Sequence, residues 1–189
     1  MGSVFFVGAG PGSADLITLR GARMLARADV VLFDALTDPA LRELAPQARW
    51  IDVGKRGFTH ATRQTAINAL LLRSAREHSQ VVRLKGGDPS LFGRLEEELQ
   101  ALAEHGIDCE VVPGITAAVA AAAVSLRPLT RRGRGRSVAV STAMTQDGEL
   151  LATRCADSEV FYMAGRQLAA RAAASVSEIS AGARLGGDG

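Results

Sequence analysis

The sequence predicts an α/β fold of two domains, the first of which is built on a parallel β-sheet. Short apolar runs alternate with longer segments of helical periodicity, and this pair recurs about five times before residue 115. The short runs are continuously apolar, as at residues 4–7, and do not alternate with polar residues. Such runs indicate strands buried on both faces, because crossover helices cover both sides of a parallel sheet. After Thr116 the pattern starts again, which predicts a second domain.

Each expected strand of the first domain ends in residues that turn the chain. The strands are predicted at residues 4–7, 30–33, 50–53, 81–84 and 107–112. Between them, apolar residues recur at helical spacing. Ser13 or Asp15 is placed to cap the first helix, and Gly106 is placed to end the last. The helices are predicted at residues 16–26, 39–45, 64–77 and 95–105. Ligands of such sheets bind at the carboxyl ends of the strands.

The second domain is expected to be smaller and incomplete. An alanine-rich helix is predicted at residues 117–124, and strands are predicted at residues 137–140 and 160–163. Beyond Gln167 the chain is rich in Ala, Ser and Gly, with little apolar periodicity. Two or three strands make a marginal sheet, so we expect a C-terminally truncated chain. The expected division is an N-terminal domain at residues 1–115, a partial C-terminal domain at 116–170 and an irregular tail at 171–189.

Composition argues against several classes of protein. Of the 189 residues, 47% are hydrophobic and 22% are charged, and the net charge of +2 is too small to indicate nucleic-acid binding by itself. No apolar stretch approaches the roughly 20 residues of a membrane span. The two cysteines and three histidines show no zinc or disulfide spacing. We therefore expect a cytoplasmic protein without a metal, with Cys109 and Cys155 as buried thiols.

Two glycine clusters stand at predicted strand ends. The first, Gly-Ala-Gly-Pro-Gly at residues 8–12, departs from the dinucleotide pattern G-x-G-x-x-G because residue 13 is serine. The second is Lys-Gly-Gly-Asp-Pro at residues 85–89. Each cluster fits a cofactor loop or a plain turn, and Asp88 fits a ligand contact or a helix cap. Asp34 stands at a strand end, where a ribose-binding acid would lie.

Two basic segments fit either solvated loops or a site for an anion. Lys55 and Arg56 follow the third predicted strand, and residues 127–136 hold five arginines. Interleaved aromatic side chains, which would stack on nucleic-acid bases, are absent. Because the forked guanidinium matches a carboxylate, a polyanionic small molecule is an alternative to a flexible basic loop.

Taken in order, these segments resemble the tetrapyrrole methyltransferase family, and most closely the branch that methylates uroporphyrinogen III. The resemblance runs from about residue 4 to about residue 168 and depends on an ordered set of motifs. They are Val-Gly-Ala-Gly-Pro-Gly at 7–12, Val-Gly-Lys-Arg at 53–56, Arg-Leu-Lys-Gly-Gly-Asp-Pro at 83–89, Val-Pro-Gly-Ile-Thr-Ala at 112–117 and Phe-Tyr-Met at 161–163.

The resemblance implies a two-domain tetrapyrrole methyltransferase fold, a homodimer, and S-adenosyl-L-methionine as the methyl donor that leaves as S-adenosyl-L-homocysteine. It implies an acid–base pair at Asp34 and Lys55, which replaces the ribose role of Asp34. The carboxylates of a tetrapyrrole would then meet Arg56, Arg131 and Arg132. The cofactor contacts that it implies are Pro11, Gly86, Gly87, Asp88, Leu91, Thr116, Ala117 and Met163.

The implied reaction converts uroporphyrinogen III to precorrin-2 by way of precorrin-1, with no nucleic acid or membrane as partner. The same motifs leave other interpretations open. One is a methyltransferase of the same fold that acts on another corrin intermediate, on RNA or on a protein. A second is a nicotinamide- or nucleotide-binding module, and a third is an inactive truncated remnant.

Overall fold

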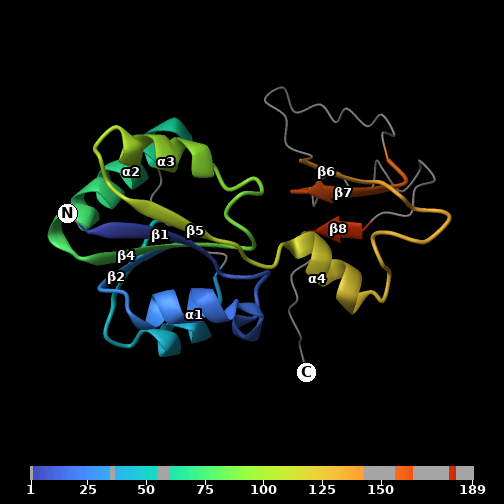
Figure 1. The fold of residues 1–189 in the computed structure, drawn as a ribbon, viewed down its shortest axis with the longest axis horizontal. Coiled ribbons are helices and arrows are strands. Elements are labelled where there is room, and N and C mark those ends of the chain that lie inside the picture. Colours follow the sequence, from blue (N-terminus) through green and yellow to red (C-terminus); the bar gives the residue numbers. More distant parts are fainter. Residues whose placement is uncertain (1, 35–36, 55–59, 143–155, 164–178, 182–189) are drawn as a thin grey trace. The chain divides into compact units, whose positions relative to one another are not determined.

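Two compact units, Met1–Thr116 and Ala117–Gly189, make up the chain in the computed structural model. The structure describes residues 2–34, 37–54, 60–142, 156–163 and 179–181. The first unit holds a five-stranded sheet and the second a three-stranded sheet (Figure 1). The predicted α/β fold with a parallel sheet is confirmed.

All strands of the first sheet run parallel, in the order β3-β2-β4-β1-β5. The strand β4 is fourth in the chain but central in the sheet, between β2 and β1. Because every strand runs the same way, their carboxyl ends share one edge. The strands are β1 (Ser3–Gly8), β2 (Val30–Phe33), β3 (Arg49–Asp52), β4 (Gln80–Lys85) and β5 (Cys109–Val112).

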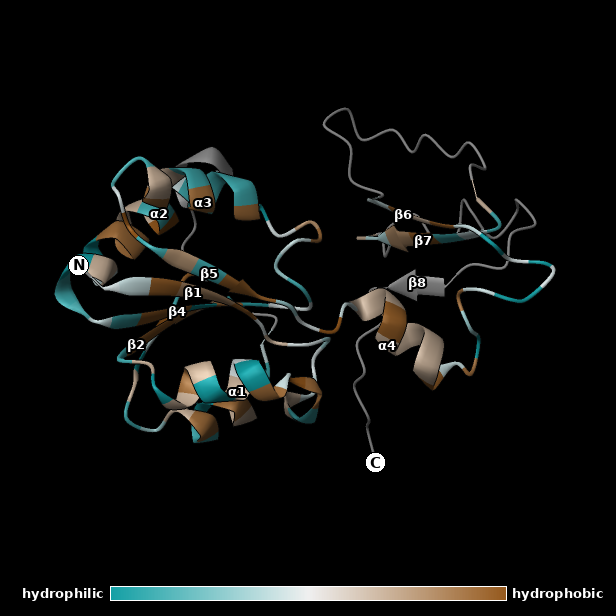
Figure 2. Ribbon diagram, in the orientation of Figure 1, coloured by the Kyte–Doolittle hydropathy of each residue, from teal (hydrophilic) through white to brown (hydrophobic). Residues whose placement is uncertain are grey.

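Helices cover both faces of this sheet, as the continuously apolar strands predict (Figures 1 and 2). Leu71 is fully buried in the apolar cluster on the face of α2 and α3, and Leu25 is fully buried in the cluster on the face of α1. Burying such a side chain stabilises the fold by about 1.5–3 kcal/mol. The helices are α1 (Leu19–Ala26), α2 (His60–Glu77) and α3 (Leu95–Ala103), with 3₁₀ helices at Ala14–Leu16 and Pro39–Leu44.

The beginnings of two helices differ from the sequence expectation. Thr18 caps α1 in place of Ser13 or Asp15, and its Oγ1 accepts a hydrogen bond from Gly21 N at 3.0 Å. The residues before it form the separate 3₁₀ turn Ala14–Leu16. The helix α2 begins at His60 rather than at residue 64. Both differences arise at helix ends, where apolar periodicity gives the weakest signal.

Two further expectations are wrong. Cys109 is exposed, because it is the first residue of the edge strand β5, while Cys155 lies outside the described residues. A strand, β8 (Ile179–Ala181), lies in the stretch that was expected to be an irregular tail. It is too short, and its neighbours too rich in Ala and Ser, for hydrophobic alternation to reveal it.

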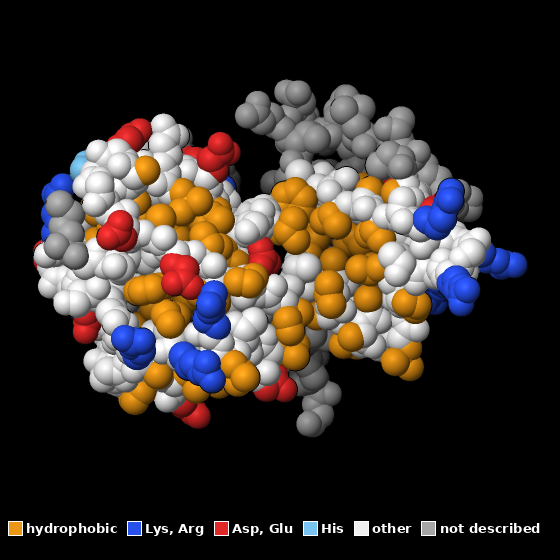
Figure 3. Space-filling view, viewed as in Figure 1, with side chains coloured by type: hydrophobic (Ala, Val, Ile, Leu, Met, Phe, Trp, Pro, Cys, Tyr) orange, Lys and Arg blue, Asp and Glu red, His pale blue; other side chains and the backbone are white. Residues whose placement is uncertain are grey.

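The second unit builds its parallel sheet in the order β6-β7-β8. The helix α4 buries Ala118, whose N–H donates to Tyr162 Oη at 3.1 Å. Val119 and Val124 on the same helix are exposed, and Figure 3 shows apolar surface over α4. Within the described residues, the chain has no helix with the length and apolar character of a membrane span. The elements are α4 (Ala117–Val124), β6 (Val138–Thr142), β7 (Ser158–Tyr162) and β8.

Asp157 fixes the place where β6 and β7 begin. Its Oδ2 accepts hydrogen bonds from the backbone N–H groups of Arg136 (2.9 Å) and Ser137 (3.1 Å), and from the Ser137 hydroxyl (2.9 Å). The bond from the Arg136 N–H is the main cause that lowers the pKa of this carboxyl below its ordinary value. The stabilisation is therefore present above the unfolded-state pKa and is lost as the pH falls through the folded-state value.

Glycines allow the backbones that follow β1, β4 and β5 to touch. A Cβ atom on Gly8 would lie 2.6 Å from Gly114 Cα and 2.8 Å from Gly87 O. A Cβ atom on Gly114 would overlap Gly87 O and lie 2.8 Å from Gly8 Cα. Because the obstructing atoms are backbone atoms, no change of rotamer could relieve the contact. We call this contact of Gly8, Gly87 and Gly114 the glycine junction.

The glycine junction predicts that Gly114→Ala destabilises the first unit. We expect the free energy of unfolding to fall by about 3 kcal/mol, at the upper end for overpacking, because backbone must move. Chemical denaturation followed by circular dichroism measures this change.

Gly106→Ala is the matched control, because Gly106 also follows a regular element and has a φ of 63°. A Cβ atom there would meet nothing within 4 Å, so only the left-handed backbone is penalised, by about 1 kcal/mol. Equal losses in the two variants would contradict the steric argument.

Candidate active site

Two loops at the carboxyl edge of the first sheet are joined by hydrogen bonds. Gly10 N donates to Gly87 O at 3.2 Å, and Gly87 N donates to Gly10 O at 2.7 Å. Ala9 N also donates to Lys85 O at 2.8 Å. Gly10 and Gly87 have φ values of 81° and 66°, which glycine adopts without strain. The two glycine clusters of the sequence therefore form one site.

Asp88 ties a third loop to these two. Its Oδ2 accepts a hydrogen bond from Gly114 N at 2.9 Å, and its Oδ1 accepts one from Ser90 N at 2.8 Å. Hydrogen bonds to a charged acceptor are the stronger kind, worth about 1.5–3 kcal/mol each. Asp88 therefore holds the loop after β5 against the loop after β4, and its carboxylate keeps further lone pairs for a ligand.

The backbone of this site leaves room for a bound molecule. A Cβ atom on Gly12 would meet nothing within 4 Å, and one on Gly87 would have Thr116 Cα as its nearest neighbour, at 3.8 Å. In the same loop as Gly87, the apolar side chains of Leu91 and Phe92 are 37% and 42% exposed. Open backbone beside exposed apolar groups suits a small ligand with polar and aromatic parts. These residues fit the methyl donor that the family resemblance implies.

Strained backbone marks the end of the same loop. Phe92 and Arg94 both have a φ of 53°, a left-handed conformation that costs about 1–3 kcal/mol in a residue with a side chain. Arg94 is held by a two-pronged ion pair, in which Nε and Nη2 donate to the two Glu97 oxygens at 2.7 Å. The hydrogen bond to Arg94 lowers the pKa of Glu97 below its ordinary value. Strain of this kind gathers at ligand sites, which supports a functional loop here.

A buried ionic cluster lies beneath the loops. It consists of Arg83 and Lys85 from β4, Glu98 from α3 and Gln64 from α2, and each of them is at most 5% exposed. Glu98 Oε1 accepts from Arg83 Nε and Gln64 Nε2, both at 3.3 Å, and Oε2 accepts from Lys85 Nζ at 2.8 Å. Burial, opposed in part by Glu98, lowers the pKa of Lys85 below its ordinary value. Removing one member of such a pair costs about 3–5 kcal/mol, because a buried charge is left unpaired.

Asp34 lies where this ionic cluster meets the solvent. It follows β2 directly, its side chain is 29% exposed, and its Oδ2 is 3.8 Å from Arg83 Nη1. The Asp34 carbonyl accepts a hydrogen bond from the Thr37 hydroxyl at 3.0 Å, which holds the turn after the strand. The structure thus gives this predicted acid–base residue a partly exposed carboxylate beside a buried guanidinium. Its predicted partner, Lys55, and the predicted substrate contact Arg56 lie outside the described residues.

The remaining predicted cofactor contacts divide between the two units. Pro11 and Thr116 belong to the first unit, where both are half-buried in the loops that follow β1 and β5. Ala117 begins α4 and Met163 follows β7, so both belong to the second unit. Met163 is 50% exposed and has a φ of 59°, which places a strained residue at the carboxyl end of that strand.

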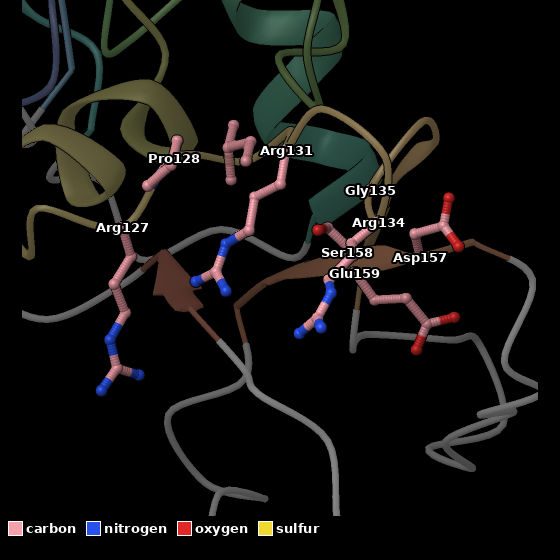
Figure 4. A pocket seen from close by; sticks show the side chains of 9 residues that line it. Arg127, Pro128, Arg131, Arg134, Gly135, Asp157, Ser158 and Glu159 are labelled. Carbon is pink, nitrogen blue, oxygen red and sulfur yellow. The ribbon is translucent and has the colours of Figure 1, made fainter.

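Arginines of the second unit line a pocket with a volume of about 410 Å³. Figure 4 shows the guanidinium groups of Arg127, Arg131 and Arg134 turned to the same side, with the Asp157 and Glu159 carboxylates at one end. Asp157 directly precedes β7 and Glu159 is its second residue, so the pocket lies at the amino end of that strand. Arg132 is exposed in the same loop.

The arginine pocket lies at the amino end of β7, and Met163 lies at its carboxyl end. The length of β7 separates them, roughly 16 Å for a five-residue strand. The predicted substrate contacts Arg131 and Arg132 are thus not brought beside the predicted cofactor contact within this unit.

Sequence reasoning missed Glu98 and Gln64. Leu95, Leu99 and Leu102 define the apolar stripe of α3, and Glu98 lies on it. An acidic residue at a position that the helical period assigns to the core would have indicated a buried partner cation. The alternating positions of Arg83 and Lys85 in β4 place both on the face that α2 and α3 cover, as for Val81, and indicate a partner acid there. Among the described residues, no group of His, Cys, Asp and Glu is arranged to hold a metal ion.

Comparisons with known proteins agree with this geometry. The profile described as Tetrapyrrole (Corrin/Porphyrin) Methylases matches residues 3–185. The uroporphyrinogen-III C-methyltransferase of Pseudomonas aeruginosa is 48% identical over 190 residues, which cover 98% of this chain and 74% of that protein. The siroheme synthase of Azotobacter vinelandii is 52% identical over 149 residues, which cover 78% of this chain and 32% of that protein. The chain thus spans about a third of the siroheme synthase.

Solved structures extend the comparison to the fold. The crystal structure of uroporphyrin-III C-methyl transferase from Thermus thermophilus, complexed with S-adenyl homocysteine, matches with a TM-score of 0.73 and 41% identity. The match covers 88% of this chain and 68% of that chain. A cobalt precorrin-4 methyltransferase matches with a TM-score of 0.67 and 33% identity, over 76% of this chain and 59% of that chain. Sequence, fold and the joined loops at the sheet edge agree, and the chain belongs to the tetrapyrrole (corrin/porphyrin) methylase family.

Proposed function

We propose that this chain transfers methyl groups from S-adenosyl-L-methionine to carbon atoms of uroporphyrinogen III, giving precorrin-2 by way of precorrin-1. The observation that carries the proposal is the 48% identity, over 98% of this chain, with a uroporphyrinogen-III C-methyltransferase. The joined glycine loops support it, since they lie at the edge where parallel sheets bind ligands. The methylation would supply sirohaem or cobalamin synthesis.

The proposed mechanism gives the chain two tasks, orientation and proton removal. S-adenosyl-L-methionine supplies, when bound, an electrophilic methyl group on a positively charged sulfur. Held by the loop at Gly86, Gly87 and Asp88, that methyl group would pass to the electron-rich pyrrole carbon. The sulfur would keep the electrons of the broken carbon–sulfur bond, and the ring would then release a proton. Asp34 accepts that proton, since its partly exposed carboxylate stands at the strand edge. Holding the reactants in line supplies the remaining rate enhancement.

The proposed cofactor site combines backbone and side-chain contacts. The glycine backbones of Gly86 and Gly87 approach the ligand, and Leu91 offers an exposed apolar surface. Asp88 keeps the loops together and accepts hydrogen bonds from the ligand with its remaining lone pairs. The complete proposed set is Pro11, Gly86, Gly87, Asp88, Leu91, Thr116, Ala117 and Met163.

Cations complete the proposed site. Lys55 acts as the partner acid of Asp34 or balances its charge. Arg56, Arg131 and Arg132 bind carboxylates of the tetrapyrrole, to which a forked guanidinium is well matched. The pocket at Arg131 gathers three guanidinium groups at the amino end of β7, so it suits carboxylates of the tetrapyrrole that lie away from Met163.

The proposal includes a cytoplasmic homodimer. Exposed apolar side chains on and after α4, at Val119, Val124 and Leu126, support a partner surface, because such groups favour association. The cytoplasm is the expected compartment because the two cysteines show no disulfide spacing.

Incubating the purified chain with uroporphyrinogen III and methyl-labelled S-adenosyl-L-methionine tests the function directly. We expect mass spectrometry to find products with one and then two added methyl groups. A chain that binds S-adenosyl-L-homocysteine but leaves the tetrapyrrole unmodified would contradict the substrate assignment. Labelling of RNA or of a protein instead would support another methyltransferase of this fold.

Asp34→Asn is expected to lower kcat by about 10²–10⁴-fold, because the amide cannot accept the ring proton. Affinity for S-adenosyl-L-homocysteine is expected to stay unchanged, since Asp34 belongs to the proposed chemistry rather than to the cofactor loops. Steady-state turnover and isothermal titration measure the two quantities. Asp108→Asn serves as the control, as it neutralises an exposed acid at the amino edge of β5. Equal turnover in both variants would remove Asp34 from the mechanism.

Asp88→Ala is expected to weaken binding of S-adenosyl-L-homocysteine by about tenfold or more, a loss of about 1.4 kcal/mol. The reason is that Gly114 N and Ser90 N lose their acceptor, which releases the loop after β5 from the loop after β4. Isothermal titration measures the affinity, and Asp108→Ala is the control. Unchanged affinity in Asp88→Ala would show that the loops hold their positions without this carboxylate.

A further inference from the structure

The buried ionic cluster reaches Asp34 at the solvent boundary. Arg83, Lys85 and Glu98 contribute two positive charges and one negative charge in a region that is almost closed to solvent. Asp34 supplies the second negative charge at the solvent boundary. Counted together, these four described side chains carry two positive and two negative charges. An acid at the strand edge is thus coupled to an acid on α3 through the cations of β4.

Arg83 is the physical connection between the two acids. Its Nε donates to Glu98 Oε1 at 3.3 Å, and its Nη1 donates to Leu84 O at 3.1 Å and lies 3.5 Å from Leu32 O. The same Nη1 lies 3.8 Å from Asp34 Oδ2. The guanidinium is thus held from the helix side and between two neighbouring strands, with Nη1 at the Asp34 carboxylate. A planar, rigid fork can hold these positions together, whereas a single ammonium cannot.

We propose that Glu98 is a positioning residue for the methyl-transfer reaction: by fixing the Arg83 guanidinium from beneath the sheet, it sets where the Asp34 carboxylate stands. This inference rests on the proposed function of the chain. Glu98 is fully buried and accepts hydrogen bonds from Arg83, Lys85 and Gln64. None of these three is a proposed cofactor contact, and Arg83 is the one that reaches Asp34. A small shift of a reacting group is sufficient to lower a rate on the order of 10²-fold.

Glu98→Gln tests the proposal, because the amide keeps the size of the side chain and removes its charge. We expect kcat to fall about 10–100-fold while affinity for S-adenosyl-L-homocysteine is unchanged. Arg83→Lys is the second variant, since it keeps the charge and removes the fork. We expect the same split between turnover and cofactor affinity.

The double variant Glu98→Gln/Arg83→Lys separates positioning from a merely structural role. If Glu98 acts through Arg83, the double variant loses no more turnover than the single ones, because the same link is already broken. The proposal would be overturned if the fold-loss of kcat in the double variant equalled the product of the two single losses. An unchanged kcat in Arg83→Lys would overturn it as well. If Glu98→Gln does not fold, the Arg83→Lys result decides alone.

Glu104→Gln is the matched control, because Glu104 is an exposed acid at the other end of α3. Its turnover is expected to equal that of the unsubstituted chain. Measuring the unsubstituted chain in parallel distinguishes a failure of the proposed function from a failure of the positioning role of Glu98. Absence of methylation by the unsubstituted chain would refute the proposed function, whereas full methylation by it and by Arg83→Lys would refute only the positioning role of Glu98.

Discussion

The glycine junction constrains the whole carboxyl edge of the first sheet. Three neighbouring strands, β4, β1 and β5, deliver their loops to the same place, and Gly8, Gly87 and Gly114 permit their backbones to touch. The bridge between Gly10 and Gly87 and the bonds to Asp88 then fix the loops against each other. A site made in this way owes its shape to backbone atoms, which change position less readily than side chains. Its geometry therefore follows from the sheet order.

The buried ionic cluster is the second constraint, and it lies at the carboxyl end of β4 on the face that α2 and α3 cover. The core face of β4 begins with Val81 and then presents Arg83 and Lys85 to the helices. Burying two cations is costly unless an acid pairs with them, and Glu98 accepts hydrogen bonds from both, while Gln64 donates to the same carboxylate. The fold accepts this cost at the ends of the strands, beside the loops proposed to bind cofactor. A purely apolar core would be simpler to pack, so the charges there point to function.

Much of the fold followed from the sequence, because the relevant signal was local. Each strand of the first sheet contains a short apolar run, and the alanine-rich helix at residues 117–124 has the bounds that its composition predicts. The glycine clusters and Asp34 were identified because they stand directly after such runs. Long-range relations were not accessible in this way. The central place of β4, the contact of Gly8 with Gly114 and the choice of Glu98 as partner for Arg83 all depend on which strands become neighbours. The strand β8 was missed for a different reason, since three residues are too few to establish a period.

The central place of β4 also has a consequence for synthesis on the ribosome. Ser3 pairs with Gln80, and Val30 pairs with Val81, so β1 and β2 have no common neighbour until β4 has emerged. The nascent chain can pair β2 with β3, but it must keep β1 unpaired and one side of β2 open until β4 is made. Non-local parallel pairing is slow to form, and until it forms the unpaired strand edges are prone to aggregation. Pauses in translation before β4 would prolong this vulnerable period, whereas pauses after β5 would give the finished sheet time to close.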